Sequence, residues 1–361
     1  MKSIQLSHGE LRFPAFFPDG TYGGVKAAGA DDLREAGVDG IVMNAYHLHR
    51  KPGQNAIRRH GGIHAFSGWD GPVLTDSGGF QVYSLIRENP DYGQILKDKI
   101  IFRPDMGNEK LIFTPEKCIQ IQFAVKSDII VCLDYCTAPD DPPEEQEKSV
   151  ETTIRWAAAC KREYEKLASG GNRPLLFAVI QGGSSRELRS RCARELIKMG
   201  FDGYGYGGWP LDARGGLVLD MLRYTAELMP ENAVKYAMGL GRPEEIAVLA
   251  GMGYDLFDCV IPTREARHNR LYAFMKAPNE ADLTDKSFYR HIYILDDKYA
   301  VDITPVSKFC DCLLCRRHSK SYLRHLFKTN DPLAYRLATM HNLRFYSMLT
   351  SQLRKNLYGY R

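Results

Sequence analysis

Four residues near the end of this 361-residue chain have side chains that bind metal ions. Cys310, Cys312 and Cys315 lie in the run Cys-Asp-Cys-Leu-Leu-Cys, and His341 follows in Met-His-Asn-Leu-Arg. Three thiolates and one imidazole can fill all four positions around a tetrahedral Zn²⁺, which leaves none for a reactive water. The spacing therefore predicts one structural zinc ion per chain. The alternative is that these are ordinary buried cysteines and a surface histidine.

Three aspartates, Asp76, Asp134 and Asp258, each follow a short apolar run. Carboxyl groups that share a partly desolvated pocket raise one another's pKa, so one can act as a general acid while another stays ionised as a nucleophile. Glycosidases use a carboxylate pair in this way for substitution at an acetal-like carbon. Each aspartate alone could instead cap the helix that follows it.

A flat base would fit beside these carboxylates. Phe80 and Met238 also follow apolar runs and could hold a base between an aromatic ring and a sulfur, although a core position is the alternative for both. Pairs of glycines allow close approach of the backbone to a ligand, but the chain has no GxGxxG or GxxxxGKS pattern. We therefore expect no organic cofactor. The glycine pairs are 78–79, 182–183 and 207–208.

The elements that position these residues form an alternating pattern. Strand-like runs occupy 13–18, 40–45, 73–77, 128–134, 174–181, 203–207, 233–240 and 254–261. Helix-like stretches between them occupy 30–37, 115–126, 143–168, 184–199, 213–229 and 242–252. Eight strands alternating with helices predict a (β/α)8 barrel, a TIM barrel, whose active site lies at the carboxyl ends of the strands. An open doubly wound sheet is the alternative.

Two insertions and a distinct C-terminal segment complete the organisation. We assign residues 1–305 to the barrel, with a hairpin-like insertion near 84–114 and further strand-like runs near 271–305. Residues 306–361 are expected to form a helical zinc-binding subdomain. Residues 301–361 hold 11 Lys and Arg against 3 Asp and Glu, within a chain whose formal net charge is +4. Such a local basic excess is typical of a surface that meets nucleic acid, or of a solvated helical face.

Composition also indicates in which cellular compartment the protein is expected. The N-terminus lacks an apolar targeting segment, and no apolar run is long enough to cross a membrane. Several of the 9 cysteines lie inside apolar segments, as reduced core thiols do. We therefore expect a cytoplasmic protein.

Four motifs together resemble the queuine tRNA-ribosyltransferases, also called tRNA-guanine transglycosylases. They are Thr-Asp76-Ser-Gly-Gly-Phe-Gln, Gln181-Gly-Gly, Phe-Asp258-Cys-Val-Ile-Pro-Thr-Arg-Glu-Ala-Arg267 and the cysteine and histidine cluster. The match runs in the correct order from about residue 10 to residue 356. It implies that guanine at the anticodon wobble position of tRNA is exchanged for a free 7-deazaguanine base.

The resemblance assigns expected roles to individual residues. Asp258 matches the nucleophile that forms a covalent bond to the ribose, and Asp76 matches the general acid and base. The residues that match base contacts are Ser77, Phe80, Asp134, Gln181, Gly208 and Met238. The residues that match RNA contacts are Gly239, Glu245, Thr263, Arg264 and Arg267. A base held for chemistry has to be flipped out of its stack, and the anticodon loop is where this costs least.

Some positions depart from the family pattern. Tyr135 replaces the usual glutamate after Asp134, and Trp209-Pro210-Leu211-Asp212-Ala213 replaces a bacterial segment that carries a glutamate for an aminomethyl substituent. The incoming base is therefore open among preQ1, preQ0 and queuine. Tyr322 and His325 fall where bacterial members have interface aromatics, with His318 in place of a tryptophan, so a homodimer is expected. Alternatives are a DNA-directed relative, a non-catalytic RNA-binding subunit and, more remotely, a glycoside hydrolase.

Overall fold

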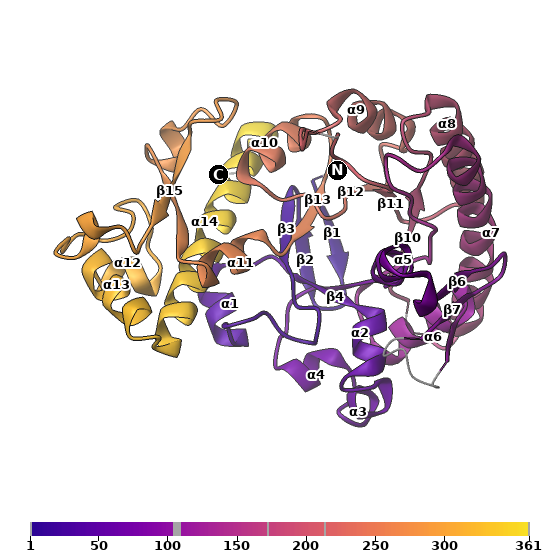
Figure 1. Cartoon of the computed structure of the whole chain (residues 1–361), viewed down its shortest axis with the longest axis horizontal. Coiled ribbons are helices and arrows are strands. Elements are labelled where there is room, and N and C mark those ends of the chain that lie inside the picture. The colour runs from indigo at the N-terminus through magenta and orange to yellow at the C-terminus, as the bar shows by residue number, and fades with distance from the viewer. Residues whose placement is uncertain (1, 104–109, 172, 213, 360–361) are drawn as a thin grey trace.

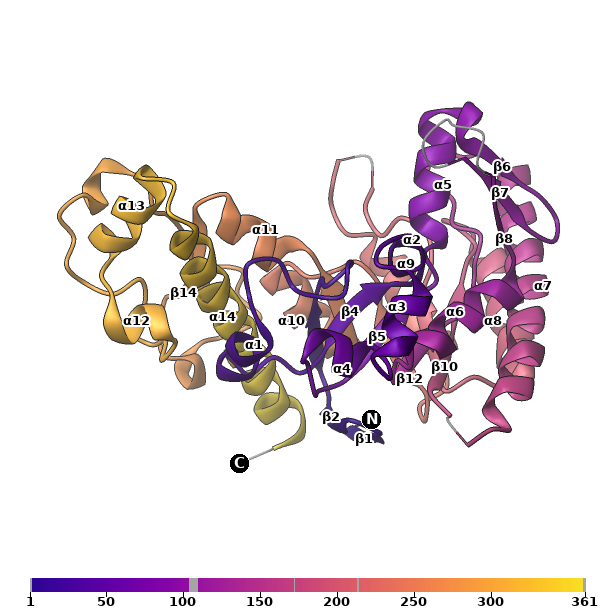
Figure 2. The same ribbon diagram turned by 90° about the horizontal axis from the view of Figure 1, so that it is seen from below.

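A barrel of eight parallel strands forms the centre of the molecule, with helices outside it (Figures 1 and 2). The computed structural model describes residues 2–103, 110–171, 173–212 and 214–359. The strands are β3 (Ala15–Pro18), β4 (Ile41–Asn44), β5 (Val73–Asp76), β9 (Ile129–Val131), β10 (Leu175–Ile180), β11 (Gly203–Tyr206), β12 (Val234–Ala237) and β13 (Leu256–Cys259). Each lies within a predicted strand, so the predicted barrel is confirmed.

The strand order shows how the barrel closes. Hydrogen-bonded neighbours follow the order β3-β13-β12-β11-β10-β9-β5-β4. The two ends of this order meet at a parallel bridge between Asp19 and Val42, where Gly20 N donates to Val42 O at 2.7 Å. The open-sheet alternative is therefore wrong. All eight carboxyl ends meet at one mouth.

Side chains alternate between the inside of the barrel and the layer beneath the helices. The inside holds one apolar cluster, to which β3, β9, β10 and β12 each contribute two residues at a spacing of two. A hairpin of β1 (Ser3–Leu6) and β2 (Gly9–Arg12) adds Leu6 and Leu11 to this cluster and so closes the end opposite the mouth. The residues that β3, β9, β10 and β12 contribute are Ala15, Phe17, Ile129, Val131, Phe177, Val179, Val234 and Tyr236.

Most helices match the predicted ones to within a few residues. The matched helices are α1 (Ala30–Ala36), α6 (Pro115–Val125), α7 (Pro143–Ala168), α8 (Arg186–Met199), α9 (Leu219–Leu228) and α10 (Pro243–Gly251). Helix α9 begins later than predicted because an antiparallel bridge between Leu211 and Leu217 holds the preceding loop. Short helices that the sequence analysis did not predict are α2 (Ala45–Arg50), α3 (Gln54–Arg59), α4 (Ile63–Ser67), α5 (Gly79–Glu88) and α11 (Ile261–Arg267).

Both insertions contain antiparallel strands. The predicted hairpin near 84–114 is confirmed as β7 (Ile100–Phe102) and β8 (Leu111–Phe113), and a third strand, β6 (Gly93–Ile95), pairs with β7. Residues 104–109 of this insertion lie outside the described residues. In the second insertion, β14 (Arg270–Phe274) pairs with β15 (Tyr289–Tyr293). Short 3-10 turns are η1 (Pro90–Tyr92), η2 (Pro278–Glu280) and η3 (Asp297–Tyr299).

The C-terminal segment is helical, as predicted, with α12 (Leu313–Arg317), α13 (Lys320–Lys328) and α14 (Pro332–Tyr358). Helix α14 contacts α1, α10 and β3, so it supplies the eighth helix of the barrel (Figure 2). Leu337 belongs to the apolar cluster of the C-terminal segment, whereas Leu349 and Leu353 belong to the cluster under the barrel helices. Within the described part of the chain, no helix is long and apolar enough to cross a membrane.

Candidate active site and metal-binding group

A cavity of about 540 Å³ opens at the mouth of the barrel. This volume is in the range of sites that enclose a small ligand. Ten of the residues predicted from the sequence line it: Asp76, Ser77, Phe80, Asp134, Gly208, Met238, Gly239, Glu245, Asp258 and Arg264. Gln181, Thr263 and Arg267 lie outside this lining. The strand ends thus bring the three predicted aspartates to one cavity.

Asp258 is fixed by hydrogen bonds to one of its two carboxylate oxygens. Tyr236 Oη and Gly239 N donate to Oδ1 at 2.7 and 2.8 Å, and Oδ2 has no hydrogen-bond partner among the described residues. Burial raises the pKa of Asp258 to about 6, because the two donors only partly offset the loss of water. At neutral pH the group is therefore mainly ionised, with one oxygen free.

Asp76 has the opposite protonation at neutral pH. Gly78 N donates to its Oδ1 at 2.8 Å. Burial, with a smaller contribution from the negative charge of Asp258, raises the pKa of Asp76 to about 8. Asp76 therefore carries a proton at neutral pH while Asp258 does not. This pair has the protonation states of a general acid and a nucleophile.

Asp134 and Gln181 form a polar edge on the other side of the cavity. Gln181 Nε2 donates to Asp134 Oδ2 at 2.7 Å, and Ser77 Oγ lies 3.5 Å from Oδ1. Burial raises the pKa of Asp134 to about 6. Gln181 is fully buried behind the lining, and its Oε1 has no hydrogen-bond partner among the described residues. The carboxylate of Asp134, which does line the cavity, is an acceptor that suits a ligand with N–H groups.

Two of the glycine pairs make room for side chains. A Cβ on Gly207 would lie 2.6 Å from Gln181 Nε2, and a Cβ on Gly182 would lie 2.6 Å from Arg189 N. Gly208 has a φ of +85°, which favours glycine, and it lines the cavity. The glycines therefore allow the polar edge to form.

Arg189 supports this edge from behind and was missed by the sequence analysis. Its guanidinium is fully buried, has no carboxylate partner within the described part of the chain, and donates to Ile180 O, Gly183 O and Gly207 O at 2.8 to 3.0 Å. It also lies over the ring of Tyr206, 4.0 Å from the ring centroid. Arg189 thus ties together the ends of β10 and β11. Its position inside the amphipathic helix α8 gave no signal of this role.

Aromatic residues stand at the cavity mouth. Phe80 and Trp209 are 42% and 44% exposed, and their ring centroids are 5.6 Å apart. Met238 lines the same cavity and packs beside Gly205, where a Cβ would lie 2.6 Å from its sulfur. The predicted flat-base slot therefore has an aromatic wall that Trp209 extends.

The two departures from the family pattern have different surroundings. Tyr135 points away from the polar edge, since its hydroxyl donates to Glu145 and its ring stacks on Trp156. Asp212 Oδ1 accepts from Arg214 N and Gly216 N at 2.8 and 2.9 Å, and Asp212 does not line the cavity. Ala213 lies outside the described residues.

The residues predicted to contact RNA divide into surface and support positions. Arg264 lines the cavity, and Arg267 lies one turn further along α11. Thr263 is buried and its hydroxyl donates to Val260 O. Glu245 accepts from Gly241 N and Arg242 N, so its side chain holds the turn that begins at Gly239.

Asp19 also lines the cavity and was missed. It directly follows β3. The signal that identifies Asp19 in the sequence is a polar residue at the carboxyl end of the first strand, where a barrel of this kind has its active site.

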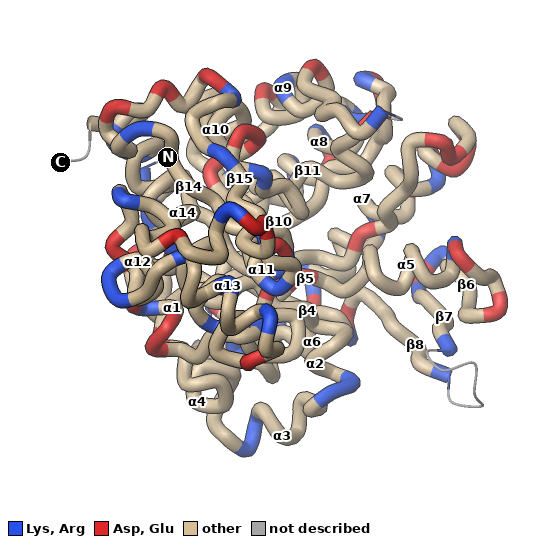
Figure 3. The backbone as a smooth tube through the Cα atoms, turned by 60° about the vertical axis from the view of Figure 1, so that its left-hand side comes forward, with Lys and Arg blue, Asp and Glu red and all other residues tan. Residues whose placement is uncertain are grey.

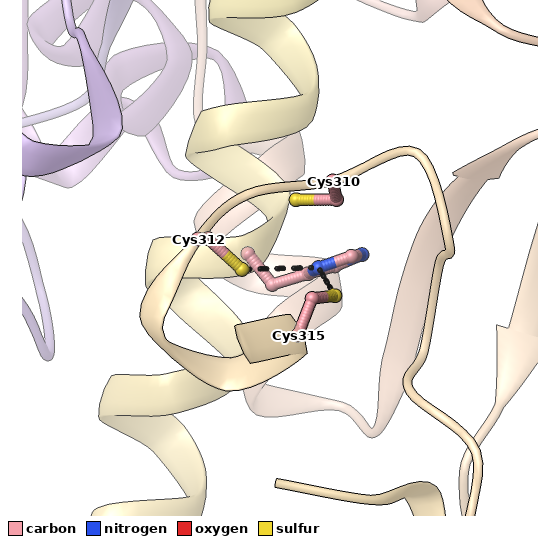
Figure 4. Close-up of side chains that lie close together, drawn as sticks. Cys310, Cys312 and Cys315 are labelled. Atoms are coloured by element: carbon pink, nitrogen blue, oxygen red, sulfur yellow. Dashed lines mark hydrogen bonds between the residues drawn. The ribbon is translucent and has the colours of Figure 1, made fainter. Parts of the chain in front are cut away.

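The four predicted metal ligands lie together in the C-terminal segment (Figure 4). Their ligand atoms are within 4.8 Å of one another, and His341 Nδ1 is 3.5 and 3.3 Å from the sulfurs of Cys312 and Cys315. His341 Nε2 lies 2.7 Å from Tyr272 O, so that nitrogen carries the hydrogen and Nδ1 presents its lone pair to the cysteines. The group can therefore bind one metal ion.

A second cluster, His8, His64 and Asp128, has a different geometry. The two imidazole rings are stacked with centroids 3.4 Å apart and an interplanar angle of 13°. Ring nitrogen lone pairs lie in the ring plane, so those of two nearly parallel rings do not converge on one ion. Asp128 instead pairs with both histidines and accepts from Val73 N, which ties the N-terminal hairpin to the barrel.

The buried carboxyl groups lead to a prediction about stability. Asp76 has a pKa of about 8 in the folded protein against an ordinary value of 3.8, so the folded state binds its proton more tightly than the unfolded state. Stability is therefore lost as the pH rises between these two values. Asp76→Asn should be more stable than wild type by about 2 kcal/mol or more at about pH 9, and this gain should shrink towards about pH 4. Urea unfolding across pH measures it.

Asp31→Asn is the matched control for Asp76→Asn, since the Asp31 side chain is fully exposed. It should show no comparable pH-dependent gain. A gain for Asp76→Asn that is absent at high pH, or that is equal at all pH values, would contradict the assignment of the raised pKa to Asp76.

Comparison with known proteins identifies the family. The family model described as queuine tRNA-ribosyltransferase matches residues 1–359. The queuine tRNA-ribosyltransferases of Psychrobacter sp. (strain PRwf-1) and Thermoanaerobacter sp. (strain X514) are each 38% identical over 352 residues, which cover 98% of this chain and 88% of each relative. That of Nitrosomonas europaea is 38% identical over 353 residues, covering 98% of this chain and 89% of the relative. The chain is a member of the queuine tRNA-ribosyltransferase family and thus a tRNA-guanine transglycosylase, a pentosyltransferase.

Proposed function

We propose that this protein exchanges guanine at the wobble position of a tRNA anticodon for a free 7-deazaguanine base through a covalent Asp258–ribose intermediate. The observation that carries the proposal is the pair of buried carboxyl groups, Asp258 with a pKa of about 6 and Asp76 with a pKa of about 8, in one cavity. A non-catalytic RNA-binding subunit has no need for such a pair. The comparisons favour tRNA over DNA as the substrate.

The reaction has two half-reactions that use the same two groups. Asp258 Oδ2 attacks C1′ of the ribose, the C1′–N9 bond breaks, and the proton of Asp76 passes to the departing guanine. The incoming base then gives its N9 proton to Asp76 and attacks C1′, which releases the Asp258 carboxylate. Protons and charge balance over the cycle, so no cofactor is consumed.

The strand order divides the cavity between base and ribose. Asp134 and Gly208, which follow β9 and β11, line the cavity, and Gln181, which follows β10, lies directly behind and donates to Asp134, so the hydrogen-bonding edge of the base faces that side. Phe80 and Met238 enclose its faces. Asp258 lies in β13, beside β3. The base therefore points towards β9–β11, and its ribose lies over β13 and β3.

We further propose that Arg264 and Arg267 of α11, with the turn from Gly239 to Glu245, contact the RNA around the wobble nucleotide. Arg264 stands at the cavity itself. Figure 3 shows additional Lys and Arg on α3 and α12, which carry Arg58, Arg59, Arg316 and Arg317. Such cations interact with phosphates largely independently of sequence.

A homodimer and a cytoplasmic location are also proposed. Tyr322 is 38% exposed and stacks on His318 with ring centroids 4.8 Å apart, which supports an aromatic contact to a second copy together with His325. All nine cysteines are free thiols, as in a reducing compartment.

Trapping of the intermediate tests the nucleophile. Asp258→Asn should abolish the denaturant-resistant protein–RNA adduct, because an amide oxygen at this position does not attack C1′. The adduct is measured by denaturing gel electrophoresis after incubation with an anticodon hairpin RNA. Asp31→Asn should form it as wild type does, and an adduct at the wild-type level in Asp258→Asn would place the nucleophile elsewhere.

The residues near the cavity mouth that depart from the family pattern, at 209–212, lead to a prediction about which base is incorporated. Asp212 is engaged in its own loop and lies away from the cavity, so the ammonium group of preQ1 lacks a charged acceptor there. The loss of one charge-assisted hydrogen bond costs about 1.5–3 kcal/mol, or roughly one to two powers of ten in preference. We expect preQ0 or queuine to compete with preQ1 as well or better in kcat/KM on one tRNA. A hundredfold or larger preference for preQ1 that Asp212→Ala abolishes would refute this.

Zinc is the metal proposed for the cysteine and histidine group, one ion per chain, held by Cys310, Cys312, Cys315 and His341 as a structural site. Cys312→Ser should release the zinc and destabilise α12 and its contacts with α14, while Cys160→Ser, which changes a buried thiol outside the group, should retain it. Metal analysis by mass spectrometry and hydrogen exchange measure the two effects. A metal-free, folded and fully active wild-type protein would contradict the assignment.

A further inference from the structure

Asp19 lies at the carboxyl end of β3, on the side of the cavity where the proposed base exchange places the ribose. It follows β3, which stands between β13, the strand of Asp258, and β4. It lines the cavity together with Asp258 and Asp76. Its negative charge contributes to the raised pKa of both groups, in agreement with a position close to them.

The carboxylate of Asp19 is held in place and has one free oxygen. Thr21 N donates to Oδ1 at 3.2 Å, and the Thr21 hydroxyl donates to the same oxygen. The backbone of Asp19 is fixed by its bridge to Val42, which closes the barrel. No hydrogen bond reaches Oδ2 from the described residues, so this oxygen is an available acceptor on a rigid support.

The chemistry of a nucleotide restricts what this oxygen can bind. A carboxylate repels phosphate oxygens and accepts hydrogen bonds from hydroxyl groups. The base edge is directed to β9, β10 and β11 on the far side of the cavity. When C1′ is beside Asp258, the hydroxyl group next to the reacting carbon is the ribose 2′-OH, and this group distinguishes RNA from DNA.

We propose that Asp19 Oδ2 accepts a hydrogen bond from the 2′-OH of the wobble ribose and thereby selects RNA over DNA at the reacting nucleotide. This inference rests on the proposed base exchange. In glycosyl transfer, a hydrogen bond to the 2-hydroxyl group becomes stronger as positive charge develops at the reacting carbon. Asp19 is thus a specificity-determining residue that acts on the ribose, separate from the residues that read the base.

The test compares two anticodon hairpins that differ only in one atom, the 2′ oxygen of the wobble nucleotide. In wild type, the single 2′-deoxy substitution should lower kcat/KM for guanine exchange by roughly one to two powers of ten. Asp19→Asn replaces Oδ2 by an amide nitrogen and keeps an oxygen for the Thr21 donors. The deoxy penalty is the factor by which the 2′-deoxy substitution lowers kcat/KM. In this variant it should fall to about threefold or less, because the acceptor of the 2′-OH is already missing.

Controls separate this inference from the proposed function. Asp31→Asn should keep the wild-type deoxy penalty, and Asp19→Ala should behave like Asp19→Asn. An equal penalty in wild type and in both Asp19 variants, or no penalty in wild type, would overturn the role of Asp19 while leaving base exchange intact. Failure of wild type to exchange guanine on the all-ribose hairpin would contradict the proposed function itself.

Discussion

Removal of carboxyl groups from water is the constraint on which the active site depends. Asp76, Asp134 and Asp258 lie at or just beyond the ends of strands whose backbone bonds are satisfied within the barrel, and their side chains line the cavity. Desolvation is the largest cause of the raised pKa of each. What differs is the set of groups around them. Asp258 accepts from a hydroxyl and a backbone N–H, whereas Asp76 accepts from the backbone N–H of Gly78, with a smaller contribution from Asn44, and has the negative charge of Asp258 beside it. The pKa is therefore raised further for Asp76, to about 8, than for Asp258, to about 6.

The order of the strands in the closed barrel determines which of the residues at the mouth face each other across the cavity. A parallel barrel places every carboxyl end at one mouth, but the order of strands around it determines which residues face each other. Here the residues of β9, β10 and β11 face those of β13 and β3 across the cavity. In the proposed reaction, recognition of the base and reaction at the sugar therefore use opposite walls. Arg189, which joins the ends of β10 and β11 through carbonyl oxygens, keeps the first of these walls fixed.

The sequence predicted the eight strands, six of the barrel helices and the meeting of the three aspartates, because apolar runs with terminal polar residues are local signals. It missed α2–α5 and α11, which lie in the segments between a strand and the next predicted element. The start of α9 was predicted too early because the bridge between Leu211 and Leu217 is a contact that no propensity encodes. Arg189 was invisible for a similar reason: in the sequence it is one of several arginines in a polar helix, and only the fold shows that it is fully buried.

Helix α14 has a consequence for how the chain reaches its native state during synthesis. It packs between α10 and α1, Arg336 pairs with Asp32, and Arg354 pairs with Asp39, so the last helix completes the wall beside the first strand. A ribosome releases these residues only after the rest of the barrel has emerged. Until then the apolar surface beneath the missing helix is exposed, and the closing contacts join residues more than 300 positions apart. Such non-local closure is slow. The docking of α14 is therefore the folding step during which the barrel exposes an apolar surface prone to aggregation.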